Sequence, residues 1–514
     1  MSRIENTLKN MFSGLIAQII VLVMNFINRT IFIKFLGVEY LGLSGLFSNI
    51  LSMLSLAELG VGVAISFSLY KPLAQKDIRK IKALMNFYSK AYHLIGIVIL
   101  VLGICLIPFL DFFIKEKPNI KNFILIYMLF LGNSVISYFF TYKRSLLSAD
   151  QKEYINIINR TIFMIIQSIV QFLVLIVFRN YIVYLLVVII CTLISNIEIS
   201  IKCNRMYPFL KKNKENLNKS ETKILLKYVG AQMSHKVGGI VVNGTDNILI
   251  TSLLKNGLVI VGLYSNYLLI INAVRNIINM FFLSVTASVG NLNAEENKEK
   301  SKQIFNNIFF LNMFFYGVTS NCIFNLINDF IRIWLGEKYI LSLDIVIVIV
   351  INYFITGMRQ SCITFNTTLG LFWNDRFKPW IEAIINLIVS IILIKYFGFI
   401  GILLGTLIST LVTSFWIEPF ILYKNGFKEK LTEYFKKYIK YTLIIGALTY
   451  ITYVITNLIV VNSFIQWVLK GTFIFFISIF LIILIFNKTA EIKELKKIIE
   501  ILLNKLSILK KRRN

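Results

Sequence analysis

The amino-acid sequence predicts an all-α integral membrane protein, and three observations carry this prediction. First, 57% of its 514 residues are hydrophobic and only 16% are charged, whereas soluble domains are about 45–50% apolar and about 25% charged. Second, the apolar residues form long runs such as Ile95–Phe113 and Ile162–Phe178, and about 20 residues of helix cross the hydrocarbon of a bilayer. Third, the basic residues are concentrated in alternate loops.

The apolar runs define the predicted helices in chain order. We predict about fourteen transmembrane helices from their length. They lie approximately at 11–35, 40–69, 83–113, 122–147, 157–178, 181–201, 226–254, 258–289, 304–333, 342–370, 380–397, 399–422, 441–461 and 464–487.

The net charge of +28 comes from lysines and arginines that gather in every second loop, as in 71–82, 202–227 and 424–440. Cytoplasmic loops carry this excess in membrane proteins. We therefore predict a multi-pass protein of the cell membrane with both termini and the basic tail 488–514 in the cytoplasm. The excess charge then faces anionic membrane lipids, and no nucleic-acid partner is predicted.

Several signatures of catalysis are missing from the sequence. The five cysteines are scattered without metal or disulfide spacing, and His93 and His235 stand alone. No phosphate-binding loop of the GxxxxGK[ST] type is present. We predict no metal, no cofactor and no enzymatic activity, so that any active transport would be driven by an ion gradient or the membrane potential.

An internal repeat divides the chain. Gly45–Asn49 (GLFSN) recurs as Gly262–Asn266 (GLYSN), a shift of 217 residues. The copies lie six predicted helices apart and share orientation, which predicts a pseudo-two-fold axis along the membrane normal. The expected organisation is two six-helix lobes with two appended helices. The predicted boundaries are 1–204 for the first lobe, 205–227 for a cytoplasmic linker, 228–425 for the second lobe, 438–487 for the appended helices and 488–514 for the tail.

The same shift pairs opposite charges within the predicted helices. Arg29 aligns with Asp246, and Glu58 aligns with Arg275. Charges inside a bilayer are costly and usually functional, so we predict that Arg29, Asp246 and Glu58 act in gating or coupling. The alternative is that such pairs lock helices together or that the side chains reach the interface.

A polar face on the predicted helix 258–289 indicates a wet cavity. Asn272, Arg275, Asn276 and Asn279 recur at helical spacing. With a rise of 1.5 Å per residue, Lys236, Arg275 and Arg359 each lie about 26 Å from the outer end of their segments. The predicted substrate-binding residues are Arg275, Lys236, Arg359, Asn272, Asn276 and Asn279.

The chain resembles the Wzx-type polysaccharide flippases of the multidrug/oligosaccharidyl-lipid/polysaccharide (MOP) exporter superfamily. The resemblance covers most of residues 1–425 in order and spacing, and its individual motifs are degenerate. They are Asn28–Thr30, Leu36–Gly42, Leu56–Gly60, Thr245–Asn247, Val261–Ser265 and Trp334–Gly336.

This resemblance implies a function and partners. Such flippases move undecaprenyl-diphosphate-linked oligosaccharide repeat units from the inner to the outer leaflet by alternating access, for surface polysaccharide biosynthesis. They rely on cavity arginines, one of which corresponds to Arg275. The implied partners are the lipid-linked oligosaccharide, membrane lipids, and the polymerase and glycosyltransferases of the same pathway.

Other functions stay open. A flippase for lipid II or a teichoic-acid precursor would carry the same diphosphate chemistry. A cation or drug antiporter of the MATE type needs an acidic site in its first helix, where this chain offers Arg29 instead. A membrane-embedded glycosyltransferase or polymerase needs catalytic acids and large outer loops, and the loops here are short. The sequence does not specify the sugar, the coupling ion, the oligomeric state or the conformational state.

Overall fold

A computed structural model describes residues 3–55, 61–115, 120–211, 215–223, 225–226, 244–293, 298–371, 374 and 376–494. Across these ranges the chain is almost entirely helical and contains no strand. It forms two compact units, Met1–Ser265 and Asn266–Asn514. The all-α membrane class predicted from the sequence is confirmed.

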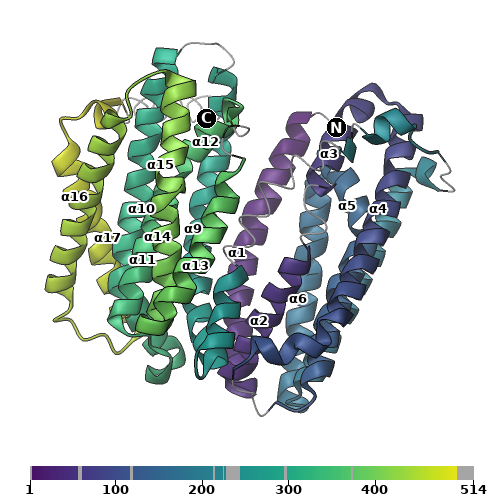
Figure 1. Cartoon of the computed structure of the whole chain (residues 1–514), viewed down its shortest axis with the longest axis horizontal. Helices are drawn as coiled ribbons and strands as arrows, with labels where there is room; N and C mark the ends of the chain where they lie inside the picture. The colour runs from purple at the N-terminus through teal and green to yellow at the C-terminus, as the bar shows by residue number, and fades with distance from the viewer. Residues whose placement is uncertain are drawn as a thin grey trace, which may run out of the picture. The chain divides into compact units, whose positions relative to one another are not determined.

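The first unit consists of long helices, several of which pack against helices that are not their neighbours in the chain (Figure 1). Gly37 joins the first two helices with a φ of +89°, a left-handed conformation that glycine adopts without strain. Asp77 caps the fourth helix by accepting a hydrogen bond from the backbone N–H of Lys80 at 2.9 Å. The elements are α1 Arg3–Leu36, α2 Val38–Leu54, α3 Val61–Gln75, α4 Ile78–Cys105, the 3₁₀ helix η2 Ile107–Phe113, α5 Phe123–Ala149, α6 Glu153–Val177, α7 Tyr181–Met206, the 3₁₀ helix η3 Pro208–Leu210 and a helical stretch over 244–253.

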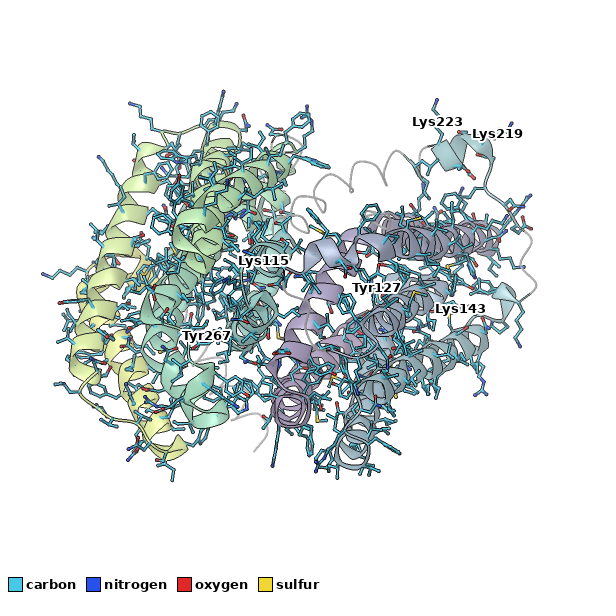
Figure 2. The ribbon with its side chains drawn as sticks, turned by 60° about the horizontal axis from the view of Figure 1, so that its bottom comes forward. Lys115, Tyr127, Lys143, Lys219, Lys223 and Tyr267 are labelled. Carbon is cyan, nitrogen blue, oxygen red and sulfur yellow. The ribbon has the colours of Figure 1, made fainter. Side chains whose placement is uncertain are left out.

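Figure 2 shows the interior and an edge of this unit. Tyr127 is fully buried, and its hydroxyl donates a hydrogen bond to the carbonyl of Gly103 on α4 at 2.9 Å. Lys219 and Lys223 lie on a short helical stretch over 219–223, whose Glu221 pairs with Lys80 of α4. The interior is therefore held by buried aromatic contacts, while lysines project from a segment of the predicted linker.

The second unit begins inside α9 and contains the remaining helices (Figure 1). Its elements are α9 Gly257–Asn293, α10 Lys298–Leu335, the 3₁₀ helix η4 Glu337–Tyr339, α11 Leu343–Met358, α12 Gln360–Thr368, α13 Lys378–Phe397, α14 Phe399–Val412, α15 Ser414–Ile421, the π-helix η6 Leu422–Phe427, α16 Thr432–Thr456 and α17 Phe464–Phe486.

In the described part of the chain, eleven helices are long and apolar enough to cross a membrane, or twelve if the bent α5 counts as one span. This number is compatible with the predicted fourteen. Of the remaining predicted runs, 40–69 is divided between the shorter helices α2 and α3, and 226–254 falls largely outside the described residues.

The two copies of the repeat pack closely against each other. A Cβ added at Gly42 would overlap the carbonyl oxygen of Leu258, and one added at Gly262 would overlap that of Val38. Only glycine permits such an approach between helix backbones. This crossing keeps residues 244–265 with the first unit. The predicted lobe boundary at 205–227 follows from the sequence repeat, whereas the two units are defined by contacts in space. The units therefore do not test this boundary, and it stays a prediction.

Helices α16 and α17, which correspond to the predicted appended pair, are fastened to α10 by buried polar groups. The amide of Asn321 donates to the hydroxyl of Ser478 at 2.8 Å, and Thr452 donates to Asn321 at 2.7 Å. Lys470 pairs with Asp329 at 2.9 Å. These contacts explain why α17 carries a lysine in an otherwise apolar run, since polar groups in a membrane bind one another.

Candidate functional site

The polar face predicted around Arg275 is present on α9. Tyr267, Ile271, Ile278 and Phe282 are buried on one side of this helix. The predicted polar residues lie outside this buried side. Asn272 and Asn276 are exposed, whereas Arg275 and Asn279 are half-buried. The polar face of α9 is therefore not fully covered by the other helices of the second unit.

An aromatic platform supports the Arg275 side chain. Its guanidinium carbon lies 5.8 Å from the ring centroid of Tyr353 on α11, within the distance at which a cation is attracted to an aromatic face. The Tyr353 hydroxyl lies 2.9 Å from Thr319 Oγ1, and its ring is 5.3 Å from that of Tyr316. Gly357 allows this packing, because a Cβ there would overlap the Tyr316 ring.

Arg275 is thus half-buried as a residue and has its guanidinium beside an aromatic ring. Arginine presents several N–H donors in a planar fork that matches the oxygens of a phosphate. Asparagine side chains on the same helix offer both donors and acceptors, which suits the hydroxyl groups of a sugar. The arrangement is suited to binding a polar anionic ligand without a metal, and no metal-binding cluster occurs among the residues that the structure describes.

Two predicted residues lie outside the described part of the chain. Lys236 and Glu58 belong to the segments 227–243 and 56–60, whose placement the structure does not describe. The predicted contact of Lys236 with substrate and the predicted pairing of Glu58 with Arg275 stay predictions.

Arg359, which we predicted to bind substrate, is engaged within the second unit. Its Nη2 and Nε donate to the carboxylate of Glu418 at 2.7 and 3.1 Å, and its Nη1 lies 3.6 Å from Glu382. Lys378 donates to the same Glu418 carboxylate. Glu418 is only 1% exposed, so this arginine balances a buried carboxylate. These bonds join α11–α12 to α13 and α15, and the predicted contact of Arg359 with substrate stays a prediction.

The first unit contains a similar cluster around Arg144. This arginine on α5 donates to Asn159 on α6 at 2.8 Å and to Ser195 on α7 at 3.0 Å, and Asn159 in turn donates to Glu198 at 2.5 Å. Arg144 and Arg359 are separated by nearly the repeat distance. Arg144 was not among the predicted site residues. Its alignment with Arg359, within two residues, is the signal that could have revealed it.

Arg29 and Asp246, which we predicted to act in gating or coupling, both belong to the first unit. Arg29 Nη1 donates to Ser265 Oγ at 2.7 Å, which links α1 to the first turns of α9. The neighbouring Asn28 donates to Ser168 on α6 at 2.7 Å. Asp246 is half-buried on the helical stretch 244–253. The predicted role of Arg29 and Asp246 in gating or coupling stays a prediction.

Solved structures of membrane transporters share this fold. A lipid II flippase, MurJ, in an inward closed conformation is 16% identical with a TM-score of 0.67, and the match covers 93% of this chain and 99% of that one. An inward-facing multidrug resistance MATE transporter of the MOP superfamily is 14% identical with a TM-score of 0.63, over 78% and 95% of the two chains. The Vibrio cholerae MATE transporter VcmN is 13% identical with a TM-score of 0.56, over 84% and 98%. No curated protein matches in sequence.

This multi-pass membrane protein thus has a helical fold similar to that of these transporters. A sequence model of one family matches residues 7–289, more than half of the chain. The chain belongs to the polysaccharide biosynthesis protein family.

Proposed function

We propose that this protein is a Wzx-type flippase. It moves undecaprenyl-diphosphate-linked oligosaccharides from the inner to the outer leaflet of the cell membrane by alternating access. Its role is transport rather than catalysis, and both termini lie in the cytoplasm. The observation that carries the proposal is the open polar face of α9, where Arg275 rests on the Tyr353 ring beside three asparagines.

In this proposal Arg275 binds the diphosphate and Asn272, Asn276 and Asn279 bind the sugar. A charge-assisted hydrogen bond contributes about 1.5–3 kcal/mol, so removing the guanidinium should weaken binding by about 10- to 100-fold. Lys236 supplies a second cation from a segment outside the described residues. Arg359 takes part indirectly, by fixing the helices of the second unit.

The experiment compares Arg275→Ala with Arg179→Ala. Arg179 is a matched control, because its guanidinium also lies 5.8 Å from an aromatic ring, that of Phe35, but outside the proposed site. We expect Arg275→Ala to block export and to accumulate lipid-linked oligosaccharide in the inner leaflet at normal protein levels, while Arg179→Ala exports normally. Normal export by Arg275→Ala would contradict the proposal.

Topology is tested separately from substrate contact. Reporter fusions after residue 213 and after Asn514 should both report a cytoplasmic location. A signal from the outer side at either position would overturn the proposed orientation.

A second candidate is a flippase for lipid II, the substrate in the name of the MurJ structure. The coverage of 93% of this chain by MurJ favours it over a MATE-type antiporter, for which the first match covers 78%. Binding assays with purified protein and with lipid II or an undecaprenyl-diphosphate oligosaccharide distinguish the two substrates.

A further inference from the structure

A groove of about 710 Å³ lies between α1 and α6 in the first unit. Its volume falls in the range of about 300–1,000 Å³ that is typical of small-molecule sites. The walls are mainly isoleucines, among them Ile16 and Ile20 from α1 and Ile158 and Ile162 from α6. None of the four is buried. In a membrane, such a surface is filled by lipid chains, which are the solvent for apolar side chains at this depth.

The shapes of the lining side chains and hydrogen bonds at one end keep the groove open. Ala17 contributes a small side chain between the longer isoleucines, and β-branched side chains on a helix have one strongly preferred rotamer. At one end Asn10 fastens the two helices together. Its amide donates to the carbonyl of Gln151 at 3.0 Å and its oxygen accepts from the N–H of Tyr154 at 2.7 Å. The width at this end is therefore fixed by hydrogen bonds.

The same end carries the charged side chain of the groove. The hydroxyls of Ser13 and Thr161, which also line it, donate to backbone carbonyls of their own helices. Lys9 Nζ lies 5.9 Å from the centroid of the Tyr154 ring, and both residues line the groove. The adjacent carboxylate of Glu153 accepts hydrogen bonds from Ser148 and Asn156. These bonds hold the carboxylate at the junction of α5 and α6. The predicted topology places this end at the cytoplasmic headgroup layer, where anionic lipids attract lysines.

We propose that this groove binds one anionic glycerophospholipid of the cytoplasmic leaflet. Its phosphate lies at Lys9 and Tyr154, and one acyl chain runs along the isoleucines toward Ile162. A single lysine matches the single negative charge of a phosphodiester. The nearly apolar walls provide no set of hydrogen-bonding groups for a sugar, which favours a membrane lipid over the transported substrate.

The test measures lipid binding to the full-length protein by native mass spectrometry. The probes are phosphatidylglycerol and phosphatidylcholine with identical acyl chains. We expect Lys9→Gln to weaken phosphatidylglycerol binding by about fivefold, which corresponds to the ~1 kcal/mol per lysine near anionic lipid. Binding of phosphatidylcholine should not change. The control is Lys71→Gln, which removes an exposed lysine of α3 outside the groove and should leave both affinities unchanged.

A second variant tests the acyl-chain part of the groove. Ala17→Phe fills the space between the isoleucines and should remove one tightly bound lipid of either kind. Unchanged phosphatidylglycerol binding by Lys9→Gln would overturn the proposal. The proposal would also be overturned if an equal concentration of undecaprenyl phosphate displaces phosphatidylglycerol from the wild-type protein but not from Lys9→Gln. The occupant of the groove would then be a polyprenyl lipid. Neither outcome depends on the export assay for Arg275, so the two proposals fail independently.

Discussion

Replacing Glu418 by glutamine tests the buried ion cluster of the second unit. The carboxylate is 1% exposed and binds both Arg359 and Lys378. Its removal takes away the carboxylate that Arg359 and Lys378 share, while Glu382 stays 3.6 Å from Arg359. Breaking a buried ion pair by removing one partner destabilises a protein by about 3–5 kcal/mol. We expect Glu418→Gln to lower the free energy of unfolding by about that amount.

The matched control is Glu429→Gln, which removes a carboxylate that pairs with Lys302 at the surface of the same unit. Exposed pairs contribute about 0–1 kcal/mol, so this variant should unfold close to the wild-type temperature. Thermal unfolding of the purified protein in detergent, followed by tryptophan fluorescence, measures both. If Glu418→Gln unfolds at the same temperature as Glu429→Gln, the cluster does not stabilise the second unit as its burial indicates.

The double variant Arg359→Met with Glu418→Gln separates stability from substrate binding. Replacing both partners of a buried pair by groups of similar volume is often nearly neutral, so the double variant should be more stable than Glu418→Gln alone. Normal export by a stable double variant would show that Arg359 does not contact the substrate. Loss of export at normal stability would instead support the contact predicted from the sequence.

Three further predictions concern other parts of the fold. Gly262→Val should lower protein levels strongly, because the valine side chain would overlap the backbone of α2. The control Gly14→Val should not, because its side chain meets open space. Quantitative immunoblotting measures the level of both variants. Lys470→Ala should loosen α17 and lower the unfolding temperature more than Lys395→Ala does, since only Lys470 is buried against an acidic partner. The exchange Arg29→Asp with Asp246→Arg should recover export that each single variant loses, and failure to do so would exclude the proposed gate.

The sequence by itself determined the class of this protein and the outline of its helices. Run length depends only on consecutive apolar residues and on the thickness of a bilayer. The polar spacing of Asn272, Arg275 and Asn279 likewise follows from helical geometry alone, and the structure leaves that face open. The repeat of Gly45 at Gly262 was also visible in the sequence. The close approach of Gly262 to the backbone of Val38 was not.

Only the tertiary structure decided which polar residues are engaged and by what. Arg275 and Arg359 look alike in the sequence, since both are arginines at the same estimated depth in apolar helices. In the fold, Arg275 rests against Tyr353, whereas Arg359 is bound by Glu418, 59 residues away. Lys470 and Asp329 are separated by 141 residues. The burial of a charge depends on which helices pack together and on how each is rotated, and these are properties of the packed helices rather than of any single segment.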